Sequence, residues 1–278
     1  MDGVGDLIDL DRYPLGERGS KRYDAFIETC RAMHDEQGAC NLQGFIRPEA
    51  IEKLRHEADT LLPVGYDKVF TRNVYFTDDD PSLPADHPVR QFWTFSSNQV
   101  ADDQIDDETL IRQIYLWQPL VDFIADVESC ATLYPMADEF QALNIIALEE
   151  GGGSPWHYDT NAFTVTLLLE APEGGGDFVY APDIRTKDNP NYDGVKRVLD
   201  GDKSLIRQLP RDAGTLTLFH GRHSLHGVEA VEGDTPRVTA IMTYDEQPDC
   251  RAGRERNTAI YGPRVEAIFK ARDMAQGR

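Results

Sequence analysis

Two metal-binding side chains stand two residues apart in the middle of this chain, and they constrain its fold more than any other feature. His157 and Asp159 lead into residues 163–169, a stretch of aliphatic and β-branched residues that predicts a strand. Residues two apart on a strand point to the same face, so the two side chains are expected to converge. A further imidazole, His226, follows the apolar run 216–219 and can arrive from another strand of the same barrel. This set predicts a site for a divalent metal ion.

Two more residues follow the second histidine. Arg237 lies eleven positions after His226, and Thr239 faces the same way two positions later. Together with His157-x-Asp159 they resemble the signature of the Fe(II)/2-oxoglutarate-dependent dioxygenases. The resemblance implies that His157, Asp159 and His226 hold Fe(II), that Arg237 and Thr239 bind the far carboxylate of 2-oxoglutarate, and that dioxygen takes the last position. A guanidinium group pairs with a carboxylate through two hydrogen bonds, which independently suits Arg237 to this role.

The same resemblance implies a mainly β fold with flanking helices around a double-stranded β-helix, a jelly-roll core of the cupin-like kind. We expect a single domain over residues 1–278, because no Ser/Gly/Pro-rich linker interrupts the chain. Residues 20–135 are expected to form a helix-rich lead-in with a substrate loop, and residues 140–248 the jelly-roll catalytic core. Residues 249–278 are expected to form a charged tail with a short helix near Val265.

Local patterns predict individual elements. Apolar spacing and end signals predict a helix over residues 21–34 that stops at Gly38, and a second helix from Pro48 to about Leu62. Helical periodicity returns over residues 109–134, with a break at Pro119. Residues 39–46 and 140–148 are expected to be strands, residues 195–206 a short helix or strand, and residues 67–99 an irregular segment.

Candidate substrate contacts come from that irregular segment and from the metal motif. Arg72 and Arg90, flanked by aromatic residues, are candidates for holding a substrate carboxylate, although ordinary solvated charges would look the same. Asn144, on the strand before the metal motif, either contacts the cosubstrate or satisfies a neighbouring backbone group. Asn161 and Arg222 belong to the segments 161–169 and 221–226, which are similar to enzymes acting on free amino acids, including radical halogenases.

Asp159 separates two outcomes within that group. The halogenases replace the carboxylate ligand with Gly or Ala to admit chloride, so Asp159 predicts hydroxylation of a C–H bond, with a free amino acid as the expected substrate. An acidic protein could favour a cationic side chain such as that of lysine or arginine. Two alternatives stay open: the same iron chemistry on a peptide or secondary metabolite, giving desaturation or cyclisation, and a non-catalytic jelly-roll metal-binding sensor. His220 and His223 are expected to support the site or to lie at the surface.

Composition narrows the partners and the compartment. A formal charge of −21 argues against a nucleic-acid partner and leaves a small-molecule substrate. The four cysteines show no Cys-x-x-Cys spacing and are expected to be small buried hydrophobes. The N-terminus lacks a basic region followed by an apolar run, and eighteen consecutive apolar residues occur nowhere. We therefore expect a cytoplasmic protein without membrane contact, and the sequence leaves a homodimer open.

Overall fold

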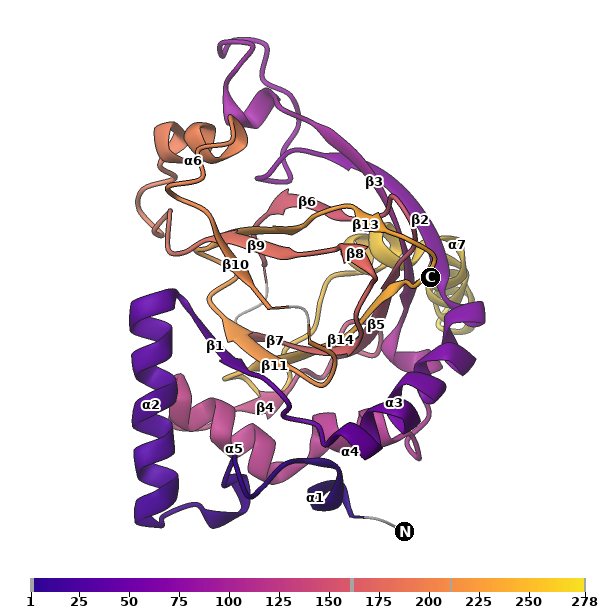
Figure 1. The fold of residues 1–278 in the computed structure, drawn as a ribbon. Helices are drawn as coiled ribbons and strands as arrows, with labels where there is room; N and C mark the ends of the chain where they lie inside the picture. The colour runs from indigo at the N-terminus through magenta and orange to yellow at the C-terminus, as the bar shows by residue number, and fades with distance from the viewer. Residues whose placement is uncertain (1–2, 161–162, 211, 278) are drawn as a thin grey trace.

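The computed structural model describes residues 3–160, 163–210 and 212–277. Its strands form two main antiparallel sheets that face each other (Figure 1). The larger sheet has the order β1-β11-β7-β14-β5-β3-β2, with β4 paired to β14, and the smaller has the order β10-β9-β12-β6. A short ladder pairs β13 with β8. Two facing antiparallel sheets of this kind make a jelly-roll, so the predicted mainly β fold with a jelly-roll core is confirmed.

The elements have the following bounds. The strands of the larger sheet are β1 (Ala39–Leu42), β2 (Tyr66–Arg72), β3 (Trp93–Val100), β4 (Tyr134–Pro135), β5 (Leu143–Leu148), β7 (Phe163–Glu170), β11 (Leu216–Phe219) and β14 (Arg237–Asp245). The others are β6 (Ser154–His157), β8 (Gly174–Gly175), β9 (Phe178–Ala181), β10 (Arg207–Leu209), β12 (Leu225–Val228) and β13 (Val231–Glu232). The α-helices are α1 (Val4–Leu7), α2 (Lys21–Gln37), α3 (Pro48–Leu61), α4 (Leu110–Leu116), α5 (Gln118–Val127), α6 (Tyr192–Leu199) and α7 (Arg254–Ala275).

Helices α2 to α5 lie beneath the larger sheet, on the side away from the smaller one (Figure 1). The Ser20 hydroxyl caps α2 by accepting from the Tyr23 amide at 3.1 Å, and α2 ends where Gly38 takes a left-handed conformation. Pro48 opens α3, and α4 and α5 are separate helices with Pro119 in the first turn of α5. The predicted helices and the boundaries at Gly38, Pro48 and Pro119 are confirmed, but the helical stretch expected over residues 109–134 ends at Val127, and Tyr134 belongs to β4.

The main core lies between these helices and the larger sheet. It includes the fully buried side chains of Leu143, Ile145, Leu167, Phe123 and Ile124. Cys30 and Cys40 belong to it, as expected of small hydrophobic side chains, whereas Cys130 and Cys250 are only partly buried, and all four thiols are free. Because this core fixes β5, β7 and β14 from one side, their other face is left for the space between the sheets. Across the described residues, no helix is both long and apolar enough to cross a membrane.

The expectation of an irregular segment over residues 67–99 is wrong. Tyr66–Arg72 and Trp93–Val100 form a regular antiparallel pair, β2 and β3, at one edge of the larger sheet. The sequence pattern did not indicate β2 because two cations face inward on this strand while an apolar residue faces solvent. Val69 is 73% exposed, whereas Lys68, Phe70 and Arg72 face inward. A strand whose inner face lines a polar site lacks the usual apolar alternation. Irregular chain remains only between these strands, with a short 3-10 turn at Pro88–Arg90.

The C-terminal segment is also more ordered than a charged tail with a short helix. Helix α7 spans Arg254–Ala275, with a kink at Gly262 before Pro263. Tyr261 and Val265 are buried against Phe140 and Ala101 in a small core of their own. The first turns of α7 thereby lie beside β2, close to the space between the sheets.

Candidate active site

The three predicted metal ligands meet at the open end of the smaller sheet. His157 ends β6, and His226 lies on β12 as its direct cross-strand partner, with ring centres 4.2 Å apart. Asp159 lies just beyond β6 instead of on a strand shared with residues 163–169, and its Oδ1 is 3.6 Å from His226 Nε2. One donor atom from each residue lies within 4.8 Å of the others. This is a spacing at which a single ion can be held.

The backbone sets the tautomer of both histidines. His157 Nδ1 is 2.8 Å from the Pro155 carbonyl oxygen, and His226 Nδ1 is 3.0 Å from the Ser224 carbonyl oxygen. A carbonyl oxygen only accepts, so both Nδ1 atoms carry hydrogen, and in the neutral form of each ring the lone pair is on Nε2. Burial, with His226 and Arg72 nearby, holds the pKa of His157 well below its usual value. Both features favour a neutral imidazole ready to ligate.

Asp159 is an anion in this setting. Burial raises its pKa, but the positive charge and hydrogen-bond donation of the facing imidazoles of His226 and His157, in their protonated form, outweigh that effect and lower the pKa to about 2. Its Oδ2 atom is buried and has no hydrogen-bond partner among the described residues. A buried carboxylate oxygen without a donor is an unfavourable arrangement that a cation would relieve. The donor set and this orphaned oxygen therefore fit a divalent metal ion.

The lack of a side chain at Gly221 leaves the space that the Asp159 carboxylate occupies. A Cβ atom at residue 221 would lie 2.1 Å from Asp159 Oδ2, far inside contact distance. The Asp159 amide also donates to the Gly221 carbonyl at 2.9 Å, which ties the two segments together. A side chain at residue 221 and a carboxylate at residue 159 are thus mutually exclusive without local movement.

Arg237 and Thr239 lie on one face of β14, as predicted. The Arg237 guanidinium donates to the Gly176 carbonyl at 3.1 Å and to the Thr239 hydroxyl. Burial lowers the pKa of Arg237 to about 10, partly opposed by Asp177, so the group stays cationic near neutral pH. Both hydrogen-bond acceptors are uncharged, which leaves the positive charge available to a bound anion.

One cavity joins this pair to the metal ligands. His157, Asp159 and His226 line it together with Arg237 and Thr239, and aromatic rings including Phe178 and Phe219 form part of its wall. The Phe178 ring stacks on His226 with centres 5.7 Å apart. We call this space the central cavity. A molecule lying in it can reach the metal ligands and the buried arginine at the same time.

The other predicted contacts divide into two groups. Arg72, from β2, lines the central cavity. Asn144 lines an adjoining pocket, where its amide donates to the Phe140 carbonyl at 2.8 Å and accepts from the Tyr261 hydroxyl at 2.6 Å. These bonds use the Asn144 amide within the protein, which favours the backbone-supporting alternative over a direct contact with cosubstrate.

Arg90 and Arg222 lie outside the residues that line these spaces. Arg90 pairs with Asp79 at 2.9 Å and donates to the Leu83 carbonyl at 3.0 Å, so it holds the segment between β2 and β3 together. Arg222 is exposed and donates to the Thr160 carbonyl at 2.8 Å, next to a separate surface pocket. Asn161 lies outside the described residues, so its role stays a prediction.

Sequence reasoning missed two cations in the adjoining pocket. Lys68 of β2 and Arg256 of α7 line it together with Arg72, His157 and Asp159. We call this space the side pocket. The inverted alternation of β2, with Lys68, Phe70 and Arg72 two residues apart, was the available signal for Lys68. Nothing local marks Arg256, because it reaches the pocket only through the packing of α7 against β2.

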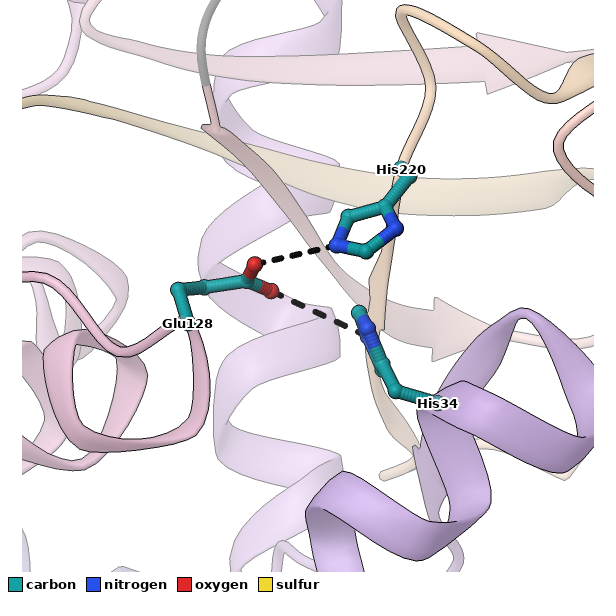
Figure 2. Close-up of side chains that lie close together, drawn as sticks. All are labelled: His34, Glu128 and His220. Carbon is teal, nitrogen blue, oxygen red and sulfur yellow. Dashed lines mark hydrogen bonds and ion pairs between the residues drawn. The ribbon is translucent and has the colours of Figure 1, made fainter.

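His220 belongs to a second group of side chains, shown in Figure 2 with Glu128 and His34. His220 Nε2 lies 3.1 Å from a Glu128 carboxylate oxygen, and His34 Nε2 lies 3.8 Å from the other. His34 Nε2 is also 3.0 Å from the Leu218 carbonyl oxygen, so in this arrangement that nitrogen carries hydrogen and offers no lone pair to a metal ion. Hydrogen bonding to Glu128 raises the pKa of His220, whereas burial lowers the pKa of His34. The group is an ion pair beside a neutral imidazole.

A protein-family model and several solved structures are similar to this chain. A family model described as halogenase D matches residues 23–262. Among solved structures, the non-heme alpha ketoglutarate dependent carbocyclase SnoK from nogalamycin biosynthesis is 16% identical, with 89% of this chain and 94% of that chain covered and a TM-score of 0.56. The alpha ketoglutarate dependent epimerase SnoN, also from nogalamycin biosynthesis, is 16% identical, with 80% and 81% covered and a TM-score of 0.55.

AviO1 from Streptomyces viridochromogenes Tue57 is 15% identical, with 78% of this chain and 93% of that chain covered and a TM-score of 0.53. No curated protein sequence matches the chain significantly. At these identities the structural likeness establishes the fold, and the family match rests on the sequence itself.

Proposed function

The chain belongs to the halogenase D family, within the 2-oxoglutarate- and Fe(II)-dependent oxygenases, and we propose that it hydroxylates an unactivated C–H bond of a free amino acid. The observation that carries the proposal is the central cavity, where three metal-type ligands and a buried arginine with its threonine face one space. A metal chelated by a keto acid and a cation for the far carboxylate are the two requirements of 2-oxoglutarate binding.

His157, Asp159 and His226 would hold Fe(II) through two imidazole nitrogens and one carboxylate oxygen. When bound together, iron, 2-oxoglutarate and dioxygen supply the oxidising chemistry, as cofactors do generally. The protein contributes binding and orientation. The Pro155 and Ser224 carbonyl groups fix both imidazole rings, and the buried Asp159 carboxylate offsets positive charge.

Arg237 and Thr239 would orient the cosubstrate. The guanidinium group is fixed by Gly176 and Thr239, so it loses little freedom when it meets a carboxylate. Thr239 is 4% exposed, so its hydroxyl is largely shielded from water. Arg72, near the metal ligands, would bind the carboxylate of the amino acid.

Asp159 supports hydroxylation over halogenation. Its carboxylate lies where a halide would have to bind, and Gly221 provides the space for it. A chain with Asp at residue 159 therefore keeps three protein ligands and no vacancy reserved for chloride. Hydroxyl transfer to the substrate is the outcome this arrangement favours.

Product analysis tests the proposal. Protein with Fe(II), 2-oxoglutarate and air is incubated with each of the common amino acids, and succinate and product masses are measured. We expect one or a few amino acids to stimulate succinate release and to gain one oxygen atom. Loss of two hydrogens instead would indicate desaturation or cyclisation. Iron binding without substrate-dependent succinate would indicate a metal-binding sensor and overturn the proposal.

A further inference from the structure

Three cationic side chains line the side pocket next to the metal ligands. Lys68 and Arg72 stand four residues apart on the inner face of β2, and Arg256 approaches from the first turn of α7. All three also line an outer groove that Asp78 borders, and Arg72 alone of the three also lines the central cavity. The three charges therefore extend from the metal ligands toward the mouth of the pocket.

Within the described part of the chain these cations make no direct ion pair, although Asp159 acts on Arg72 and Arg256 at longer range. The Arg72 guanidinium lies over the rings of Phe76 and Phe70, at 4.1 and 4.8 Å, and its buried Nε has no hydrogen-bond acceptor there. Lys68 Nζ lies 4.2 Å from the centre of the Phe70 ring. Other arginines of α7 are paired, such as Arg264 with Asp103 at 2.7 Å. The side pocket thus concentrates positive charge in a chain whose formal charge is −21.

Acidic side chains do not balance these charges inside the pocket. Among its described lining residues, Asp159 is the acidic one, and it is committed to the metal site. Burial, with Arg72 nearby, lowers the pKa of Lys68 to about 8, and burial lowers the pKa of Arg72 to about 9, with Asp159 opposing this shift and Arg256 adding to it. Holding several cations together in a partly buried site is costly unless an anion joins them.

We propose that the substrate is an amino acid with a second anionic group on its side chain, and that Lys68 and Arg256 bind this second group while Arg72 binds the carboxylate nearer the metal. The inference rests on the proposed function and names its substrate class. Carboxylate and phosphate share the required chemistry. A cationic side chain, which the acidity of the whole chain could suggest, would meet three like charges here.

Lys68 and Arg256 are not placed to bind the cosubstrate. Arg237 and Thr239 already provide for one carboxylate on β14, within the central cavity. Lys68 and Arg256 line the side pocket and the outer groove but not the central cavity. Changes at these two positions should therefore alter substrate binding without altering the requirement for 2-oxoglutarate.

The test measures binding without turnover. Protein with Fe(II) and saturating 2-oxoglutarate is titrated anaerobically, by calorimetry, with L-aspartate, L-glutamate, O-phospho-L-serine, L-leucine and L-lysine. We expect at least one acidic ligand to bind roughly tenfold or more tightly than leucine and lysine, since it alone can form charge-assisted hydrogen bonds with Lys68 and Arg256. Comparing the carboxylates with the phosphate identifies the second group. Equal or tighter binding of leucine or lysine overturns the inference.

Variants of Lys68 and Arg256 test whether these side chains bind the second anionic group. Lys68→Met and Arg256→Gln should each weaken the preferred acidic ligand roughly tenfold to a hundredfold and leave the apparent KM for 2-oxoglutarate unchanged. Lys68→Arg and Arg256→Lys keep the charge and should retain most of the affinity, which controls for folding. Unaltered binding by both neutral variants overturns the assignment. If no amino acid stimulates succinate release, the proposed function fails, whereas the binding preference of wild-type protein still decides this inference.

Discussion

His157 and His226 are direct cross-strand partners on β6 and β12, with their rings 4.2 Å apart. Residues 69 positions apart in the sequence are thereby fixed by the register of one antiparallel pair. Carbonyl groups next to each histidine hold the Nδ1 hydrogen, so the Nε2 atoms face the same space. The proposed metal site is consequently built largely into the sheet, and of its three residues only Asp159 lies beyond a strand end.

The first prediction concerns Arg237. Arg237→Ala removes the buried cation, and the apparent KM for 2-oxoglutarate should rise roughly tenfold or more. Arg237→Lys keeps the charge but loses the second hydrogen bond, so its KM should fall between those of the alanine variant and wild type. Steady-state kinetics with varied 2-oxoglutarate measure both. An alanine variant with wild-type dependence on 2-oxoglutarate would show that the cosubstrate binds elsewhere.

Gly221 provides a second prediction. Gly221→Ala places a Cβ atom 2.1 Å from Asp159 Oδ2, so the carboxylate must move and the Fe(II) affinity should fall roughly tenfold to a hundredfold. In the Asp159→Gly background the added methyl group meets no carboxylate, and it should cause no further loss. Anaerobic Fe(II) titration of the four proteins measures this coupling. Equal losses from Gly221→Ala in both backgrounds would contradict the close approach.

Arg72 and Arg90 can be separated by a third experiment. Arg72→Ala should weaken substrate binding and leave Fe(II) affinity intact, because Arg72 lines the cavity but is not a ligand. Arg90→Ala breaks the contacts with Asp79 and Leu83, so it should lower thermal stability and leave the affinity for substrate near wild type. Substrate calorimetry and thermal unfolding distinguish the two. Loss of substrate binding in Arg90→Ala alone would restore Arg90 as the carboxylate site.

The ion pair in Figure 2 predicts a pH-dependent stability. Glu128, with Asp183 and Asp35 contributing, raises the pKa of His220, while His34 stays neutral because burial lowers its pKa. A raised pKa stabilises the fold fully below the unfolded value, about 6.5, and this contribution disappears as the pH rises through the folded value. His220→Gln should therefore lower the Tm at mildly acidic pH and much less at alkaline pH.

Thermal unfolding across this pH range checks the ion pair, with His56→Gln as a control, because His56 is an exposed residue on α3. A Tm difference between wild type and His220→Gln that stays constant with pH would mean that the pair contributes no charge interaction. Addition of zinc or a chelator should not change the difference, since the His34 Nε2 hydrogen bonds to Leu218.

Spacing and residue type predicted that His157, Asp159, His226 and Arg237 would lie together, and the structure brings all four to one cavity. His157, Asp159, His226 and Arg237 carry chemistry that few other residues can supply, and each stands on or next to a short strand. The helices of the lead-in were predictable because Gly38, Pro48 and Pro119 mark boundaries that depend on local backbone properties. The motif residues and the helix-boundary residues can both be recognised from short stretches of sequence.

The substrate side depends on tertiary packing and was only partly predictable. The inner face of β2 is polar because it lines a pocket, so hydrophobic alternation did not reveal the strand. Arg256 contributes because α7 packs beside β2, a contact between the end of the chain and residues near its start. Arg72 and Arg90 looked equivalent in sequence, and the structure separates them because Arg72 lines the central cavity whereas Arg90 pairs with Asp79 outside it.

The most direct test of the proposed hydroxylation determines whether the oxygen atom added to the product comes from dioxygen. Wild-type protein is incubated with Fe(II), 2-oxoglutarate, chloride and an accepted amino acid under labelled dioxygen, and the product is examined by mass spectrometry. If Asp159 is a metal ligand as proposed, it occupies the position that chloride would need, so we predict a product with one oxygen atom from dioxygen, formed together with succinate, and no chlorinated product. A chlorinated amino acid as the main product, or wild-type-like hydroxylation by Asp159→Gly, would contradict the assignment of Asp159 as a metal ligand.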